Sequence, residues 1–574
     1  MRAGEKPLCP GQKALETRIP VRIVCAARSA TLLLLTLPIA VQAQFIFVTN
    51  SGALTITGYT GSGGAVTVPE ITNGLSVTGI GNSAFSGKSS VTSVTVPNSV
   101  TNIGSSAFSH CTSLSYITIP NSITEIGDAA FEYCAKLPTV TMPNNITRIG
   151  DGLFRSCTSL INVTIPNTVT NIGGSAFANC ISLTDFAIPN SVTSIGQYAF
   201  VGCTSLTNID IPDGVANIGN YMVYGCSSLT NIILPKSVNH IEFAAFYYCP
   251  NLSAIMVDTE NSSYSSLDGV LFNKTQTALI KYPEGKVGSY AIPSSVISIG
   301  TSAFNACFNL TSVIIPNGVS NIGNSAFAQC LSLISIVIPN SVTNMEDGTF
   351  AFCPNLTNIV IPDSVNRIGN NAFYNCRRLA NFMIPDSVTS IGDYAFYNCA
   401  SLTKVTIPDS VTNIGNIVFS GCTNLITVTI PGSITRIGND EFYDCHNLTG
   451  VFFKGNAPST GTHVFYNDYQ LTVYYLPGTT GWGATFGDPF SYRPTALWNP
   501  QVQTGDLSFG VRTNRFGFRI VGTTNIPIVV EACADLTSLA WVSLQSGDLS
   551  NGLLYFSDPQ WTNHASRFYR LRWP

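Results

Sequence analysis

Cysteine is the residue type in this chain whose number and spacing could support chemistry. Of the 17 cysteines, fourteen fall into two series in which every interval is 23 residues. The two series comprise Cys111, Cys134, Cys157, Cys180, Cys203, Cys226 and Cys249, and then Cys307, Cys330, Cys353, Cys376, Cys399, Cys422 and Cys445. Thiols can form disulfides, bind zinc or act as nucleophiles. Which of these applies depends on the elements that position them.

The other residue types that carry catalysis show no comparable pattern. The five histidines share no position of the repeat, and the chain contains no H-E-x-x-H, G-x-S-x-G or P-loop motif. Isolated carboxylates such as Asp185 and Asp210 lie on predicted strands, and we interpret them as ordinary side chains on the solvent-exposed face of those strands. The segment DTENSSYSSLDG lacks the acidic spacing of an EF-hand loop. We therefore expect no enzymatic activity, no cofactor and no metal.

The 23-residue interval indicates a solenoid built from stacked units. In the unit that begins at Cys111, the alternation Ile117-Thr118-Ile119 predicts a short strand, which Pro120 ends. The Ala130-Phe131 pair predicts one short helical turn that places the phenylalanine in the core. One unit buries too little apolar surface to fold alone, so the units must stack on one another. The recurring phenylalanine predicts fifteen units.

Stacking decides between the possible roles of the cysteines. Residues in one column have parallel Cα–Cβ bonds, which leaves their Cβ atoms ~4.8 Å apart, whereas a disulfide prefers ~3.8 Å. Zinc sites normally use closely spaced pairs such as C-x₂₋₄-C, and the repeat supplies none. We therefore predict that the two series are buried as free thiols in the core. Cys533, outside the repeat, is predicted to be an unpaired thiol.

The repeat resembles that of the BspA-like leucine-rich-repeat proteins of bacteria, whose unit is close to LxxIxIPxxVxxIGxxAFxxC. The resemblance covers roughly residues 50 to 480 and includes the opening segment LTITGYTGSGGAVTVPEITNGLSVTGIGNSAF. It implies a right-handed α/β leucine-rich-repeat solenoid with a parallel β-sheet on its concave face. It also implies a secreted or surface-exposed protein, and several family members bind host or matrix proteins.

Composition and the N-terminus agree with an exported protein that does not bind nucleic acid. Only 10% of the residues are charged, against a typical ~25%, and the formal net charge is −4. The apolar stretch TLLLLTLPIAV follows basic residues and precedes Val41-Gln42-Ala43, which suits signal-peptide cleavage before Gln44. Residues 1–43 are therefore predicted to be a signal peptide, with no transmembrane segment in the mature chain.

The pattern predicts the following organisation after the signal peptide. The solenoid spans 44–445, with a hairpin insertion at about 258–286, where GVLFNKTQTALIKYP reads as two strands around a turn. Residues 446–492 are predicted to cap the last unit, and 493–506 to form a Pro-containing linker. Short alternating runs predict a small all-β sandwich over 507–574.

One column of the predicted sheet is the candidate binding site. The position two residues before the recurrent proline is threonine in the first units and again in the last, but it is apolar in the middle of the chain, flanked by a column of small or polar residues. The apolar members are Ile233, Met256, Ala291, Ile314, Val337, Val360 and Met383. Such a run indicates an interaction site for an extracellular or surface protein, or a glycan. The preference of exposed strands for β-branched residues is a simpler explanation, and self-association in a structural role is the rival function.

Overall fold

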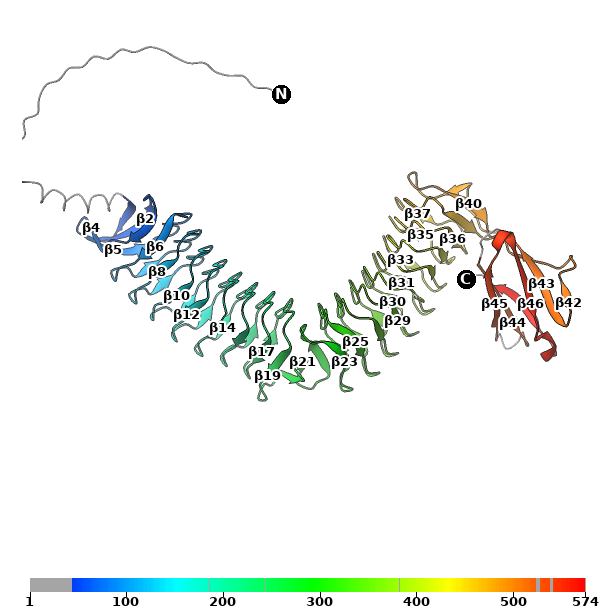
Figure 1. Cartoon of the computed structure of the whole chain (residues 1–574), viewed down its shortest axis with the longest axis horizontal. Helices are drawn as coiled ribbons and strands as arrows, with labels where there is room; N and C mark the ends of the chain where they lie inside the picture. Colours follow the sequence, from blue (N-terminus) through cyan, green and yellow to red (C-terminus); the bar gives the residue numbers. More distant parts are fainter. Residues whose placement is uncertain are drawn as a thin grey trace, which may run out of the picture.

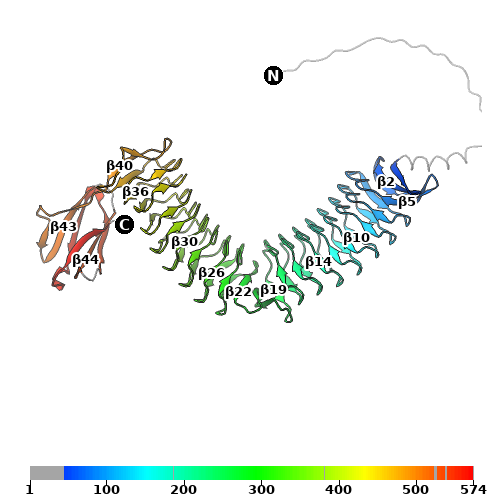
Figure 2. The same ribbon diagram turned by 180° about the vertical axis from the view of Figure 1, so that it is seen from behind.

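The computed structural model describes residues 44–572 apart from residues 185, 243, 381, 523–526 and 537–539. The predicted signal peptide, with Cys9 and Cys25, lies outside the described residues. Figure 1 shows an elongated solenoid of two arms that meet at an angle, followed by a smaller β module at the C-terminal end. The same path is seen from behind in Figure 2. The leucine-rich-repeat solenoid and the all-β module that follows it are both confirmed.

The parallel sheet predicted from the Ile-x-Ile-Pro segments is present, and we call it the first ladder. Its strands pair in parallel with a register of one repeat, as in Thr139↔Asn162 and Val140↔Val163. Its side chains alternate between the core and solvent. The strands of the first arm are β3 (Gly64–Thr67), β6 (Val91–Thr95), β8 (Tyr116–Thr118), β10 (Thr139–Thr141), β12 (Asn162–Thr164), β15 (Asn208–Asp210), β17 (Asn231–Leu234) and β19 (Ala254–Val257). Those of the second arm are β23 (Gly288–Ala291), β25 (Leu310–Ile314), β27 (Ser335–Val337), β29 (Asn358–Val360), β32 (Lys404–Thr406), β34 (Thr427–Ile430), β36 (Gly450–Phe453), β38 (Thr472–Tyr475) and β40 (Arg493–Leu497).

A second ladder of mostly two-residue strands follows the turn after each recurrent proline. It begins on an N-terminal hairpin, β1 (Phe45–Asn50) with β2 (Ala53–Tyr59), and β2 pairs with β5 in parallel. The strands are β5 (Leu75–Ile80, with β4, Ile71–Thr72, at its edge), β7 (Asn102–Ile103), β9 (Glu125–Ile126), β11 (Arg148–Ile149), β13 (Asn171–Ile172), β14 (Ser194–Ile195), β16 (Asn217–Ile218), β18 (His240–Ile241), β24 (Ser298–Ile299), β26 (Asn321–Ile322), β28 (Asn344–Met345), β30 (Arg367–Ile368), β31 (Ser390–Ile391), β33 (Asn413–Ile414), β35 (Arg436–Ile437) and β37 (Ser459–Thr460).

The recurrent glycine after this strand, which only Glu242 and Glu346 replace, is favoured by close packing between coils. A Cβ at Gly127 would overlap the backbone of Ser105 in the preceding coil, and Gly127 does not adopt a left-handed φ. The glycine therefore recurs because it lets two backbones approach, rather than because of its conformational freedom.

The third side of each coil, which we call the turn face, differs from the prediction. The segment around Ala130-Phe131 is a series of tight turns and not a helical turn. Ala129 and Tyr133 adopt left-handed φ values of 56° and 58°. Alternate N–H groups therefore point to the next coil, as in the bond from Phe131 N–H to Leu153 O (3.0 Å). Among the described residues, helix is limited to two 3₁₀ turns, η1 (Ser550–Gly552) and η2 (Trp561–Asn563).

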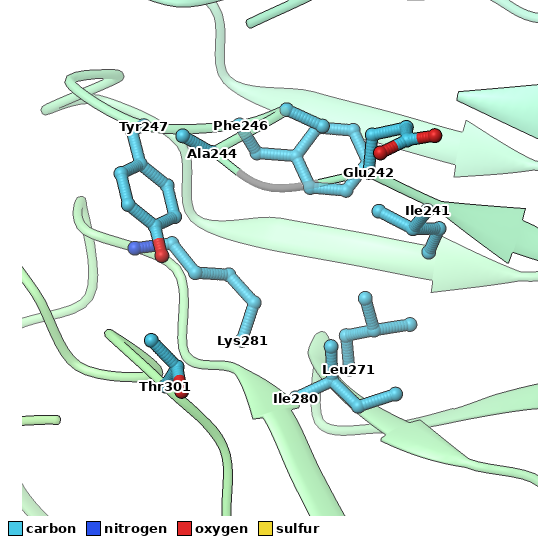
Figure 3. A pocket seen from close by; sticks show the side chains of 10 residues that line it. Ile241, Glu242, Ala244, Phe246, Tyr247, Leu271, Ile280, Lys281 and Thr301 are labelled. Atoms are coloured by element: carbon cyan, nitrogen blue, oxygen red, sulfur yellow. The ribbon is translucent and has the colours of Figure 1, made fainter. Parts of the chain in front are cut away.

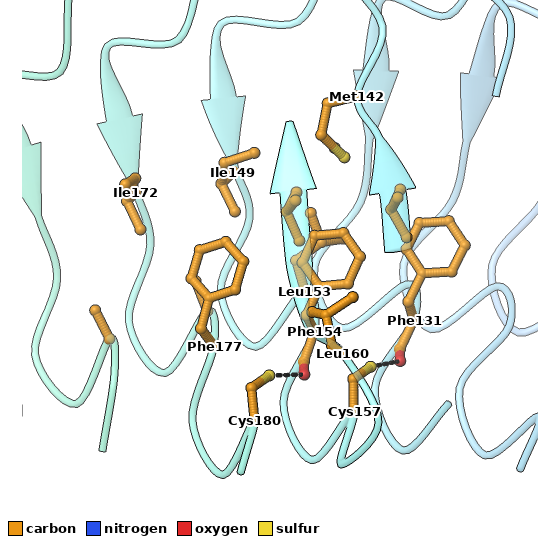
Figure 4. Packing of buried hydrophobic residues seen from close by; sticks show 14 of the residues in the cluster. Phe131, Met142, Ile149, Leu153, Phe154, Cys157, Leu160, Ile172, Phe177 and Cys180 are labelled. Carbon is orange, nitrogen blue, oxygen red and sulfur yellow. Dashed lines mark hydrogen bonds between the residues drawn. The ribbon is translucent and has the colours of Figure 1, made fainter. Parts of the chain in front are cut away.

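The turn face carries the phenylalanine and cysteine columns into the core, as Figure 4 shows. Phe131 stacks on Phe154 with ring centroids 5.6 Å apart, and Phe154 stacks on Phe177 at the same spacing. The Cys157 thiol donates to the carbonyl oxygen of Phe131 (3.0 Å), and the same bond recurs along the column. All fourteen repeat cysteines and Cys533 are buried and free. The prediction of a column of buried thiols is confirmed.

We expect these thiols to be unreactive in the folded protein. Burial raises the pKa of Cys157 and of Cys203 to about 12, so almost no thiolate is present at pH 8. In labelling with a thiol reagent under native conditions, fewer than one cysteine of residues 44–574 should react within an hour. In denaturant, every cysteine should react. Rapid native labelling of several cysteines would contradict the buried column.

The predicted hairpin interrupts the repeat at the junction of the two arms. Strand β21 (Val270–Asn273) pairs antiparallel with β22 (Ala278–Lys281). The structure adds a third strand, β20 (Tyr264–Leu267), which pairs antiparallel with β21. Strand β22 then pairs in parallel with β24 and so leads into the second ladder of the second arm. Leu271 packs in the core of the first arm and Phe272 in that of the second, so the hairpin joins the two cores.

Residues 493–506, which the sequence analysis interprets as a linker, contribute strands instead. β40 pairs in parallel with β38 and extends the first ladder, while β39 (Thr485–Phe486) pairs antiparallel with it. β41 (Gln501–Gln503) belongs to the C-terminal module. The prolines suggested a linker, but Pro494 lies in β40 and pairs with Thr485 of the short strand β39. Trp498 is fully buried. This segment therefore connects the solenoid to the module through packed structure.

The C-terminal module consists of two antiparallel sheets. One contains β41, β43 (Arg515–Val521), β42 (Gly510–Arg512) and β46 (Leu553–Asp558), and the other contains β45 (Val542–Asp548), β44 (Pro527–Cys533) and β47 (Phe568–Arg572). Its core includes Phe518 and Phe556, and it packs against Phe452 and Tyr474 of the last coils. The described residues include no helix with the length and apolar character needed to cross a membrane.

Candidate interaction surface

Six of the seven candidate residues lie where the predicted alternation placed them, on the solvent side of strands of the first ladder, whereas Met383 is exposed but lies on no strand. Ile314 and Val337 are 68% and 66% exposed, and Met383 is 86% exposed. Ala291, Ile314, Val337 and Val360 occupy one column of a continuous hydrogen-bonded sheet, because each pairs with the next. These four residues therefore form an uninterrupted apolar row.

The same row does not continue unbroken into the first arm. Ile233 pairs with Met256, but the strand of Met256, β19, pairs with β17 and not with β23. The turn at Gly269 of the insertion lies beside β19, where the Gly269 carbonyl accepts the Ile255 N–H (2.8 Å). The structure thus divides the seven residues into a short group, Ile233 and Met256, and a longer group on the second arm.

Met383 extends the longer group toward the C-terminal module. It lines a cavity of about 570 Å³ together with Phe382 and Lys404 of the solenoid and with Val529 and Arg572 of the module. Burial, together with Arg572, lowers the pKa of Lys404, while Asp548 opposes that change. The module therefore forms a wall at one end of the apolar row, which the sequence analysis did not predict.

The junction of the arms holds a buried ion pair that sequence reasoning also missed. Glu284 is fully buried, and its carboxylate accepts the N–H groups of Tyr248 (3.1 Å) and Cys249 (2.7 Å) and the Lys281 ammonium (3.0 Å). Figure 3 shows Lys281 beside the ring of Tyr247 at a small cavity of about 160 Å³. The chain itself supplies all of these partners, so the carboxylate offers no open position for a substrate. Its role is to join the two arms, because the partners come from the last coil of the first arm and from the insertion.

The family model for the BspA-type leucine-rich repeat region matches residues 78–205, 170–291, 281–389 and 366–481. These overlapping ranges run without a gap over more than half of the chain. The chain belongs to the BspA-type leucine-rich-repeat family. Leucine-rich-repeat surface proteins of this kind are generally protein-interaction or adhesion modules, on a scaffold that usually carries no enzyme activity.

Several solved structures are similar to this BspA-type chain. A leucine-rich-repeat protein from Bacteroides ovatus is 27% identical over 68% of this chain and 93% of its own, with a TM-score of 0.45. A leucine-rich cell surface protein from Faecalibacterium prausnitzii is 28% identical over 72% of this chain and 94% of its own, with a TM-score of 0.39. A leucine-rich-repeat protein from Eubacterium ventriosum is 26% identical over 66% and 93%, with a TM-score of 0.43. A search of curated proteins finds no match.

The part of the chain that the structure describes contains no cluster of three or more His, Cys, Asp or Glu side chains arranged to hold a metal ion. The repeat cysteines each contact a backbone carbonyl of the preceding coil rather than a second thiol ligand. The sites in this BspA-type protein to which we assign a role are therefore surfaces and not reaction centres.

Proposed function

We propose that this BspA-type protein is secreted or surface-exposed and binds an extracellular protein through the apolar row on the first ladder. The observation that carries this proposal is the exposure of Ile314, Val337 and Val360 on three paired strands, at a position that holds threonine in coils toward both ends of the ladder. Burying such a row against a partner removes apolar surface from water at no cost in lost hydrogen bonds. The flanking Ser335 and Asn358 supply a polar rim. Export is supported by the signal-like N-terminal sequence.

A structural role through self-association is the second candidate function. The observation that favours it is the regular, weakly charged surface, since charge-poor faces repel copies of the same chain less strongly. In this case the apolar row would contact a second copy, and no separate ligand would exist.

A triple substitution of Ile314, Val337 and Val360 by threonine tests the proposal. Threonine already occupies this column at Thr141 and Thr164, so the variant should fold normally. Loss of the apolar contacts should weaken binding at least tenfold, measured by surface plasmon resonance on an array of purified extracellular-matrix proteins. Sedimentation at increasing concentration measures self-association in parallel.

The matched control replaces three exposed isoleucines away from the row, Ile46, Ile71 and Ile181, by threonine. This control should bind as tightly as the original chain. If the triple variant folds and still binds as tightly as the original chain, the proposed site is contradicted. The charged hairpin near Lys274 then becomes the next candidate site. Loss of self-association alone would favour the structural role.

A further inference from the structure

A hollow on the turn face of the second arm is lined by aromatic side chains that the fold does not need. Phe352, Tyr374 and Tyr394 come from three successive coils and surround a space of about 350 Å³ together with Ala351 and Asn371. Phe352 is 46% exposed and Tyr394 is 37% exposed. Large aromatic rings in solvent contribute little to the core, so their presence on adjacent coils requires another explanation.

The rings line the hollow at an angle to one another. The centroids of Phe352 and Tyr374 are 5.1 Å apart with a 56° angle between the ring planes. The corresponding values for Tyr374 and Tyr394 are 6.4 Å and 58°. Tyr374 also stacks on Tyr397 of the next coil (4.8 Å, 13°), which fixes the orientation of its ring. The three rings therefore form a shaped surface with a defined geometry.

Two of these aromatic residues adopt a backbone conformation that disfavours them. Phe352 and Tyr394 have left-handed φ values of 60° and 57°. Bulky residues rarely adopt this conformation, whereas glycine and asparagine adopt it readily. The equivalent positions in neighbouring coils hold Asn375 for Phe352, and Gly348 and Asn371 for Tyr394. The repeat thus accepts less strained residues at both positions, and tyrosine also occurs in these columns on the first arm, as at Tyr133 and Tyr198.

The chemistry of the lining selects a neutral ligand of small cross-section. The lining residues carry no charge, and they supply an amide group from Asn371 and hydroxyl groups from Tyr374 and Tyr394. A pyranose ring matches this lining, because its polarised C–H groups pack on the electron-rich face of an aromatic ring while its hydroxyl groups bond to amides and phenols. The volume lies at the small end of ligand pockets. The five residues that line the hollow are too few for a protein interface, which takes about 20–30 residues from each partner.

We propose that the hollow formed by Phe352, Tyr374 and Tyr394 binds a sugar unit of a neutral polysaccharide. This site is separate from the apolar row on the first ladder and does not depend on the function proposed for that row. The protein would then hold a glycan on its turn face and a protein partner on its first ladder.

Affinity gel electrophoresis of residues 44–574 with hydroxyethyl cellulose, yeast mannan or laminarin tests the proposal. At least one of these polysaccharides should slow the migration of the protein. The double variant Phe352→Asn and Tyr394→Asn should weaken that binding at least tenfold. Because asparagine already occupies the equivalent positions, this variant should retain the far-UV circular dichroism and thermal stability of the original chain.

The matched control is Tyr133→Asn, which makes the same kind of change at an exposed left-handed residue in the column of Phe352, on the first arm. It should bind polysaccharide normally. The proposal is overturned if none of the three polysaccharides binds, or if the double variant binds as well as the control. It is also overturned if only a synthetic proline-rich peptide binds the hollow. The triple variant of Ile314, Val337 and Val360 should bind polysaccharide as tightly as the original chain. The two proposals can therefore fail independently of each other.

Discussion

Replacing Glu284 by alanine is expected to lower the stability of the solenoid by about 3–5 kcal/mol, because it leaves the Lys281 ammonium buried without its counter-ion. Both side chains are almost completely buried, with Lys281 4% and Glu284 0% exposed. Burial alone would lower the pKa of Lys281, but Glu284, together with the side chains of Cys307 and Tyr247, outweighs burial and raises the pKa above its ordinary value. The lysine therefore stays charged in the folded protein.

The backbone around Glu284 explains why a carboxylate is needed at this point. In a regular coil the N–H after the turn donates to a carbonyl of the next coil, as Tyr133 N–H does to Arg155 O (2.8 Å). After Cys249 the insertion delays the next coil, so the Tyr248 N–H lacks that carbonyl and donates to Glu284. The Cys249 N–H also donates to Glu284, whereas its equivalents donate within their own coil, as Cys134 N–H does to Phe131 O (3.1 Å). Buried N–H groups without an acceptor cost about 1–3 kcal/mol each.

The measurement is the midpoint of urea unfolding followed by far-UV circular dichroism. The exposed pair of Lys236 and Glu260, whose Nζ and Oε2 atoms are 3.1 Å apart, provides the control. Glu260→Ala should change the stability by less than about 1 kcal/mol, as is usual for surface pairs. The combined variant Lys281→Met and Glu284→Gln should recover part of the loss by removing both buried charges. A loss below 1 kcal/mol for Glu284→Ala would contradict the role of this pair.

The regular part of the fold could be predicted because each coil reuses the same side chains. The period of the cysteines fixed the stacking, and the alternation at Ile117-Thr118-Ile119 fixed which side chains face the core, so the exposed positions of Ile314 and Val337 followed. The family resemblance added the expected type of solenoid. The predictions that depended on the cysteine period and on the strand alternation were therefore confirmed wherever the repeat is regular.

The features that could not be predicted depend on contacts that no periodicity of side-chain types records. The tight turns near Phe131 are stabilised by hydrogen bonds to the next coil, and such bonds leave no helix or strand period in the sequence. Trp498 packs between the last coils and the C-terminal module, so the surrounding Pro-containing segment only resembled a linker. Strands β19 and β23 do not pair, because the insertion folds between them, and this interruption divides the candidate residues into two groups.

The stability of the last coils is expected to fall as the pH rises from 5 to 8, because Asp468 occupies the position that cysteine holds in the preceding coils. Asp468 is fully buried, and neither of its carboxyl oxygens has a hydrogen-bond partner among the described residues. Burial raises the pKa of Asp468 to about 8, while Arg493 opposes that change. The folded protein therefore binds the proton more tightly than the unfolded chain, whose aspartates titrate near ~3.9.

The sign follows from proton linkage. Between pH 4 and pH 8 the folded state holds a proton on Asp468 that the unfolded state has lost, so raising the pH favours unfolding, with little further change above about 8. The upper bound of this effect is about 6 kcal/mol, since the pKa of Asp468 differs by about four units between the two states and each unit corresponds to ~1.4 kcal/mol. Glu441, which replaces the alanine of its column, is also fully buried, and burial raises its pKa as well, so it adds to the effect in the same direction.

Asp468→Cys should remove most of the Asp468 contribution to this pH dependence. The new thiol can donate to the Phe442 carbonyl, as Cys445 donates to Phe419 O (3.1 Å), and it stays neutral across this range. Unfolding midpoints measured from pH 5 to pH 8 should show the variant gaining stability over the original chain as the pH rises. Asp468→Asn separates charge from packing, because it removes the ionisation but keeps a buried polar group. If the curves of Asp468→Cys and the original chain run parallel from pH 5 to pH 8, Asp468 does not carry the buried proton.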